Sequence, residues 1–251
     1  MGVDGNYALP HYSFTQLKFI SMLEKPTFPD EKLVACLHAD YGLNVGTITF
    51  LPIGADEDTA VYRIISTDQT HYFLKLRSGI FDETSVTLPK LLSDQGILQI
   101  IPPVPTKSGW LWANLDAFKT ILYPFVDGKN GYEMKLSKQQ WTKLGAALKS
   151  IHSATLPSSL VKKIRQETYS PRWRNSLKHF LSRPKPNSYP DAIASEVAAF
   201  LRYKRDDLVD LVQRADCLAK MLSAHPPEHI VCHSDLHAGN ILIEPNGDLY
   251  I

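Results

Sequence analysis

Residues 233–242 read His-Ser-Asp-Leu-His-Ala-Gly-Asn-Ile-Leu. This segment places a carboxylate, Asp235, five residues before an amide, Asn240, and a β-prone apolar stretch follows at once. A short loop that leads into a strand can present both side chains from one rigid turn. A carboxylate held in this way can take the proton of an attacking hydroxyl, and an amide oxygen is a suitable ligand for a hard cation such as Mg²⁺.

The spacing of these two residues is typical of loops that transfer a phosphoryl group from a nucleotide. Asp235 is therefore the candidate catalytic base, and Asn240 is the candidate magnesium ligand. In this interpretation His233 braces the loop and His237 lies close to the site. The chemistry also requires a nucleotide site, which has to come from the rest of the chain.

The sequence before this loop divides into a β-rich half and a helical half. The hydrophobic patterns predict strands at 47–52, 60–66, 71–76, 109–114 and 117–125, with helices at 13–25, 31–41 and 82–95. They then predict long helices at 136–153 and 193–222 and a hairpin formed by 241–244 and 249–251.

This order predicts an α+β, two-lobed, protein-kinase-like fold. We expect a β-rich nucleotide-binding lobe at 13–122, a hinge at 123–131 and a helical lobe with the catalytic loop at 132–251.

Lys75 lies in the third predicted strand, and Glu83 begins the following helix. A lysine at this place can reach the α- and β-phosphates of ATP when a carboxylate holds it. Glu83 is the natural partner and Asp82 its nearest competitor. The alternative is that Lys75 is an ordinary exposed strand residue.

Two further segments could contact a nucleotide. The turn that begins at Gly54 could cover phosphates with its backbone N–H groups, although its three acidic residues also suit a solvated hairpin turn. In the predicted hinge, the Pro124 carbonyl could accept a hydrogen bond from the adenine amino group, while the Val126 N–H could donate one. By itself this hinge sequence is also an edge strand that enters a turn.

The pattern His233-x-Asp235-x-His237 also suits the metal site of a hydrolase. Such a site needs further ligands, and the remaining histidines show no ligand-like pairing. Cys232 beside the loop is expected to be buried at the end of a strand, and Trp110 and Trp112 are expected to pack on one strand.

The composition excludes several classes of protein. The chain has 251 residues, 44% of them hydrophobic, and a net charge of +1, so it can form one large domain or two lobes and carries no bulk basic field for nucleic acid. Three cysteines are too few and too scattered for a disulfide framework, which favours a cytoplasmic protein. Polar residues and Pro10 interrupt the first 23 residues, so we expect neither a signal peptide nor a membrane span.

From about residue 17 to residue 251 the chain resembles the aminoglycoside phosphotransferase and choline kinase superfamily, and most of all its spectinomycin phosphotransferases. The catalytic loop is the most specific carrier of this resemblance. The others are Tyr72-Phe-Leu-Lys-Leu-Arg77, Phe81-Asp-Glu-Thr84, Tyr123-Pro-Phe-Val126, Trp141-Thr-Lys-Leu-Gly145 with Ile151-His152, and Tyr169-Ser-Pro-Arg-Trp-Arg174.

The resemblance implies ATP and Mg²⁺ as cofactors and a small-molecule acceptor, an aminocyclitol antibiotic or a related amine, with no nucleic acid or membrane partner. It implies a role in antibiotic resistance. Members of the family continue past the last hairpin with an aspartate that bridges the metals, and this chain ends before it. The resemblance therefore implies a truncated helical lobe, and a polypeptide that ended at Ile251 would have severely impaired catalysis.

Other functions stay open at this point. Kinases of choline-like or other hydroxylated amines share the loop, and a non-catalytic, nucleotide-binding remnant would also keep these motifs.

Overall fold

The computed structural model describes residues 25–53, 56, 58–183 and 191–251. The chain forms two compact units, which we call the sheet unit (Met1–Ala154 with His233–Ile251) and the helical unit (Thr155–Cys232). The helix predicted at 13–25 lies almost wholly outside the described residues. None of the described helices combines the length and the apolar character that a membrane span needs.

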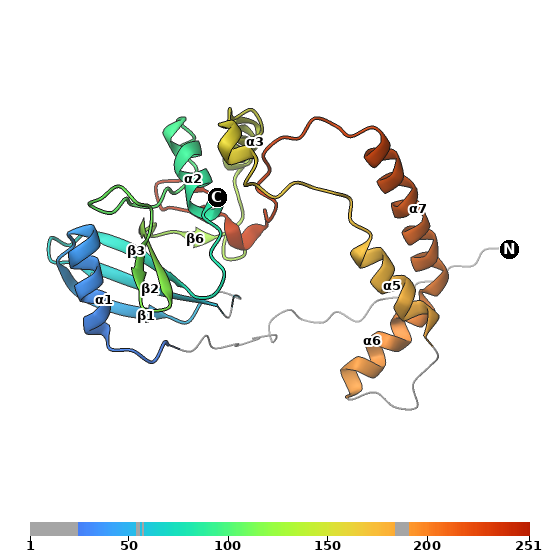
Figure 1. The fold of residues 1–251 in the computed structure, drawn as a ribbon, viewed down its shortest axis with the longest axis horizontal. Coiled ribbons are helices and arrows are strands. Elements are labelled where there is room, and N and C mark those ends of the chain that lie inside the picture. Colours follow the sequence, from blue (N-terminus) through green and yellow to red (C-terminus); the bar gives the residue numbers. More distant parts are fainter. Residues whose placement is uncertain (1–24, 54–55, 57, 184–190) are drawn as a thin grey trace. The chain divides into compact units, whose positions relative to one another are not determined.

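A five-stranded antiparallel sheet dominates the sheet unit (Figure 1). Its spatial order is β1-β2-β3-β5-β4, and its strands are β1 (Val45–Leu51), β2 (Thr59–Ser66), β3 (His71–Arg77), β4 (Ala113–Leu115) and β5 (Phe118–Pro124). In the register Lys75 lies between Val61 of β2 and Ile121 of β5. The prediction of five strands between residues 47 and 125, with Lys75 in the third, is confirmed except for the bounds of the fourth strand.

Side chains alternate between the two faces of this sheet. Leu74 and Leu76 are fully buried in one core cluster with Leu33 and Leu37 of the helical segment that precedes β1. Because Lys75 stands between the two leucines, its side chain belongs to the opposite face. The alternation of side chains along β3 thus places Lys75 on the face of the sheet opposite the main core.

The segment on that core begins as helix α1 (Asp30–Cys36) and continues as a π-helical turn, η2 (Leu37–Tyr41). It ends at Gly42, whose φ of 71° suits glycine. The prediction of a helix at 31–41 that ends at Gly42 is confirmed, apart from the wider final turn.

The strand predicted at 109–114 is largely wrong, because β4 pairs only from Ala113 to Leu115. Trp110 and Trp112 precede it in irregular chain, with ring centroids 5.6 Å apart. The predicted helix at 82–95 is present as α2 (Thr84–Asp94).

A second, three-stranded sheet of the same unit contains the hairpin that follows the loop 233–240. It has the order β6-β7-β8, with β6 (Lys129–Asn130), β7 (Leu242–Ile243) and β8 (Leu249–Tyr250). Helix α3 (Lys138–His152) starts at a capping box between Ser137 and Gln140.

Leu144 of α3 is buried against the hairpin residues Ile241, Ile243 and Leu249. Trp141 of the same helix is 58% exposed. The helix therefore buries a narrower stripe than its pattern of apolar residues suggests.

The helical unit consists of α4 (Ser158–Val161), α5 (Arg172–Ser182), α6 (Ala192–Tyr203) and α7 (Arg205–Ala224). The single helix predicted at 193–222 is wrong. The helical backbone is interrupted at Lys204, where ψ is 15°, so α6 and α7 are separate helices. Lys204 pairs with Asp207 in the first turn of α7, at 3.0 Å. A new helix can start here because acidic side chains at 206 and 207 favour a helix N-terminus.

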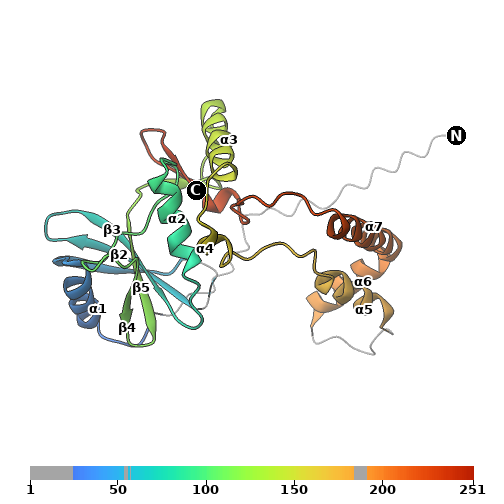
Figure 2. The ribbon, with the colours of Figure 1, turned by 45° about the horizontal axis from the view of Figure 1, so that its top comes forward.

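Figure 2 shows α5 and α6 beside α7 within this unit. Arg174 connects α5 to α7, because its Nε donates to Asp216 at 2.7 Å and its Nη2 donates to the Tyr169 carbonyl at 3.0 Å. Lys178 also pairs with Asp216. The stretch 169–174 therefore has a structural role in joining two helices.

Candidate functional site

A cavity of about 480 Å³ lies within the sheet unit. Its wall contains residues of β1, β3, the segment after β5, the turn after β6, and β7. They are Leu51, Ile53, Phe73, Lys75, Ile101, Tyr123, Pro124, Phe125, Val126, Gly128, Asn130, Glu133 and Leu242. Three of the residues predicted from the sequence, Lys75, Pro124 and Val126, thus line one cavity.

Aromatic and aliphatic side chains form most of the cavity wall. The rings of Phe73 and Tyr123 lie with their centroids 6.5 Å apart. Burial raises the pKa of Tyr123 to about 12, so this phenol stays neutral. A flat apolar ligand such as a purine base suits such walls.

Lys75 brings a cation to the edge of this apolar space. Burial lowers the pKa of Lys75, the nearby Arg77 lowers it further, and Asp56 partly offsets both effects. An anionic ligand would relieve this unfavourable environment.

Gly54 lies outside the described residues, but Asp56 of the same turn is described. Its carboxylate accepts hydrogen bonds from the Asp58 N–H at 3.1 Å and the Thr59 hydroxyl at 3.0 Å, and it pairs with Arg77 at 2.9 Å. Burial raises the pKa of Asp56, but these hydrogen bonds and the Arg77 charge outweigh it and leave the pKa below its usual value. Asp56 is thus joined to β3 by an ion pair.

Glu83 occupies the N-cap position of α2, as predicted. Its competitor Asp82 is engaged in capping this helix, because its Oδ1 accepts from the Thr84 N–H at 2.9 Å and from the Thr84 hydroxyl at 2.7 Å. The charges that act on the pKa of Lys75 are those of Arg77 and Asp56, so the pair of Lys75 with Glu83 stays a prediction.

The loop 233–242 brings Asp235 and Asn240 into direct contact. The Asn240 Nδ2 donates to the Asp235 carbonyl at 2.8 Å and to the Asp235 Oδ2 at 3.1 Å. Since the amide nitrogen faces Asp235, the Asn240 Oδ1 remains available as a ligand. The Asp235 side chain is 78% exposed, so a substrate hydroxyl can reach it.

His237 is oriented by the loop backbone. Its Nδ1 accepts from the Gly239 N–H at 3.0 Å, which places the proton of a neutral ring on Nε2. That Nε2 lies 3.9 Å from the Asp235 Oδ2. A Cβ at Gly239 would come within 2.9 Å of the His237 ring, so only glycine fits there.

Glycines also join the predicted hinge segment, 123–131, to the loop 233–242 and the strand β7 that follows it. The Gly131 N–H donates to the Ala238 carbonyl at 2.8 Å. A Cβ at Gly128 would come within 2.9 Å of the Ile243 carbonyl oxygen. The two segments therefore contact each other through their backbones, and both the cavity and the loop belong to the sheet unit.

Comparison with known proteins agrees with this geometry. A model of the phosphotransferase enzyme family matches residues 49–250, which is most of the chain. The chain belongs to this family.

Two solved structures of a family member are similar to this phosphotransferase. One is the crystal structure of spectinomycin phosphotransferase, APH(9)-Ia, in complex with ADP and spectinomycin, with 32% identity and a TM-score of 0.79. It matches 90% of this chain, which spans 68% of that one. The AMP-bound complex of the same enzyme has 31% identity, a TM-score of 0.75, and coverages of 88% and 68%.

An aminoglycoside phosphotransferase from Alicyclobacillus acidocaldarius shares the fold. Its identity is 17% and its TM-score is 0.60, with 91% of this chain and 66% of that one covered. A search of curated proteins gives no match. The two-lobed kinase-like fold is thus confirmed.

The rival metal site of a hydrolase finds no support in the described part of the phosphotransferase, where no three His, Cys, Asp or Glu side chains gather as a metal site. The Nδ1 atoms of His233 and His237 instead accept from backbone N–H groups of the loop. Cys232 was expected to be buried, but it is exposed, because the chain before the loop forms no strand.

The Asn240 Oδ1 suits a magnesium ion that is held mainly by nucleotide phosphates. Few protein ligands are needed in such a site, because the phosphates and water supply most of the coordination.

Sequence reasoning missed several residues of the cavity wall, among them Phe73, Glu133 and Leu242. Alternation along β3 could have placed Phe73 on the same face as Lys75. The other two reach the cavity only because the chain returns to it after the hinge and after the catalytic loop.

Proposed function

We propose that this protein is an ATP-dependent phosphotransferase that moves the γ-phosphoryl group to a hydroxyl of an aminocyclitol or aminoglycoside antibiotic. Among these antibiotics, spectinomycin is the acceptor that we propose. The observation that carries this proposal is the cavity shared by Lys75, Pro124, Val126 and Leu242, since Leu242 directly follows the loop of Asp235 and Asn240. The similarity to an enzyme crystallised with ADP and spectinomycin supports the choice of ligands.

In the proposed nucleotide site, the hinge binds the adenine base and β3 provides the lysine that contacts the phosphates. The Pro124 carbonyl and the Val126 N–H bind the edge of adenine, between apolar walls. Lys75, held by Glu83, contacts the α- and β-phosphates, and the turn at Gly54 covers them. In this scheme 13–122 is the nucleotide-binding lobe, 123–131 is the hinge, and 132–251 belongs to the helical lobe.

The transfer step uses Asp235 as its base. The Asp235 carboxylate orients the acceptor hydroxyl and takes its proton while the hydroxyl oxygen forms a bond to the γ-phosphorus. The bond from that phosphorus to the β,γ-bridging oxygen breaks, and ADP leaves. A bound magnesium ion, with Asn240 as a ligand, would neutralise phosphate charge during transfer.

His237 helps to define the geometry of this base. Its Nε2–H faces the Asp235 carboxylate, and the contact of Asn240 with the same carboxylate limits its rotation. Both contacts hold the Asp235 carboxylate in one orientation, which a positioned proton acceptor requires.

The test is mass spectrometry of candidate acceptors after incubation with Mg-ATP. Spectinomycin, a panel of aminoglycosides and choline would be compared with a Lys75→Ala variant as the control. A product heavier by one phosphoryl group, formed only with an intact Lys75, supports the proposal. Phosphorylated choline alone would assign another amine kinase, and nucleotide binding without any product would indicate a non-catalytic remnant.

A further inference from the structure

Glu133 lies on the cavity wall, in the turn that follows β6. Among the described residues around this cavity it is the only carboxylate, and Lys75 is the only cation. The remaining wall is mainly apolar or aromatic. The cavity therefore has one cationic and one anionic group, contributed by β3 and by the turn after β6.

The position of Glu133 is fixed by reciprocal hydrogen bonds with Asn130. The Glu133 Oε2 accepts from the Asn130 N–H at 2.9 Å. In return, the Asn130 Oδ1 accepts from the N–H groups of Tyr132 at 2.9 Å and Glu133 at 3.2 Å. This is the arrangement of a capping box, and it holds the carboxylate at the cavity without a helix.

The Glu133 carboxylate can accept further hydrogen bonds beside the one from Asn130, since its two oxygens together can accept about four. Glu133 is also exposed, which places its carboxylate at the mouth of the cavity. A ligand that enters the cavity can therefore meet an oriented acceptor there.

The chemistry of a nucleotide matches these two groups. Its phosphates require the Lys75 cation, and its base requires the apolar hinge wall, so the sugar joins the two. A ribose carries two adjacent hydroxyl groups, which are hydrogen-bond donors that a carboxylate can accept. Phosphate beside Glu133 would instead be repelled.

We propose that Glu133 accepts a hydrogen bond from the 2′- or 3′-hydroxyl of the bound nucleotide and makes the cavity selective for ribonucleotides. This inference rests on the proposed function, because it assigns the sugar subsite of the same nucleotide cavity. It makes Glu133 a specificity-determining residue.

The test combines changes in the protein with changes in the nucleotide. Isothermal titration calorimetry would measure the affinities for ATP, 2′-deoxyATP and 3′-deoxyATP in the wild-type protein and in Glu133→Ala and Glu133→Gln variants. We expect the wild type to prefer ATP over one deoxy analogue by about tenfold, as for a solvent-accessible hydrogen bond to a charged group. Glu133→Ala should lower ATP affinity to that of this analogue and leave the analogue's own affinity unchanged.

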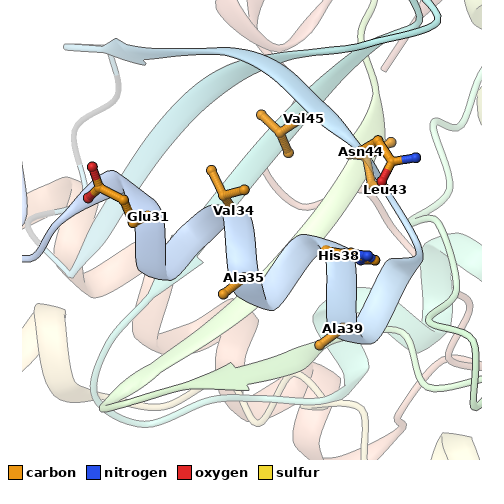
Figure 3. Close-up of a pocket in the computed structure, with 8 residues that line it drawn as sticks. All are labelled: Glu31, Val34, Ala35, His38, Ala39, Leu43, Asn44 and Val45. Atoms are coloured by element: carbon orange, nitrogen blue, oxygen red, sulfur yellow. The ribbon is translucent and has the colours of Figure 1, made fainter.

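Glu31→Gln provides the matched control. Glu31 lies on α1 beside a separate groove, on the same unit (Figure 3). Its substitution removes the same charge without touching the nucleotide cavity. We expect unchanged affinities for all three nucleotides.

Two results would overturn the inference while leaving the proposed function intact. One is a wild-type protein that binds ATP and both deoxy analogues equally. The other is a Glu133→Ala variant whose affinities for ATP and for the deoxy analogues fall by the same factor, which would show that Glu133 only supports its turn. A wild-type protein that binds none of the three nucleotides would overturn the proposed function itself.

Discussion

The sheet unit and the helical unit of this protein differ in how they bury apolar side chains. In the sheet unit large side chains such as Tyr62, Leu74 and Leu122 are almost completely buried. In the helical unit the described buried hydrophobic residues are Ala198, Val212 and Ala219, while Trp173 is 74% exposed and Phe200 is 60% exposed. The sheet unit therefore has a packed core of its own, and the helical unit has much less.

This difference explains where a precise site can be built. A cavity that orients a nucleotide needs walls whose side chains are fixed by packing. The cavity, the hinge and the catalytic loop all belong to the sheet unit. In the helical unit, ion pairs at Asp216 contribute to the contact between α5 and α7.

The largest effect is expected inside the sheet unit, at Asp235. Asp235→Asn should lower kcat by about 10²–10⁴-fold, because the amide cannot accept the hydroxyl proton. The affinity for ATP should stay near that of the wild type, because Asn keeps the side-chain shape. A coupled assay of ADP release and a separate nucleotide titration would measure both; a variant with normal kcat would remove Asp235 from the role of base.

A second prediction compares the cores of the two units directly. Leu74→Ala should lower the free energy of unfolding by about 2–5 kcal/mol, because it leaves a cavity in the sheet core. Leu218→Ala, at a side chain that is 56% exposed, should change it by no more than about 0.5 kcal/mol. Urea denaturation followed by circular dichroism would test this contrast, and equal losses in the two variants would contradict it.

The third prediction uses the depressed pKa of Lys75. Because burial favours the neutral amine, rising pH should remove the Lys75 charge earlier than it would for an exposed lysine. The affinity for ATP should therefore fall as the solution is made alkaline. Lys75→Arg keeps its charge at these pH values and should delay the fall. If the affinity for ATP fell at the same pH in the wild type and in Lys75→Arg, a phosphate contact through the Lys75 ammonium would be refuted.

The smallest effect is expected in the helical unit, at Asp216. A hydrogen bond from Lys178 and one from Arg174 lower the pKa of Asp216. The stabilisation of the fold by the ionised Asp216 should be complete above the ordinary aspartate pKa of about 3.9. It should be lost as the pH falls through the lowered pKa that Asp216 has in the folded protein.

Asp216→Asn should remove this part of the pH dependence and slightly lower the Tm at neutral pH. Thermal melts of this variant at neutral and acidic pH, with Glu196→Gln as an exposed control on α6, would measure it. If Asp216→Asn and the wild type lost the same Tm on acidification, the ion pairs would not stabilise the unit.

Much of the fold could be predicted because local patterns agree with the final structure. The alternation in β3, the end of the helical segment at Gly42 and the turn before β8 depend on nearby residues. The break at Lys204 could not be predicted in this way, because apolar residues continue in helical spacing on both sides of it. The exposure of Trp141 depends on which face α3 presents to the hairpin.

The sequence by itself determined that Asp235 and Asn240 share one loop and that Lys75 leaves the sheet on the face opposite its leucine neighbours. These are short-range properties, fixed by spacing and alternation. Only the tertiary structure decided that Glu133 and Leu242 meet Lys75 around one cavity. These residues belong to segments that are far apart in the chain, and the pairing of β6 with β7 brings the segments of Glu133 and Leu242 together.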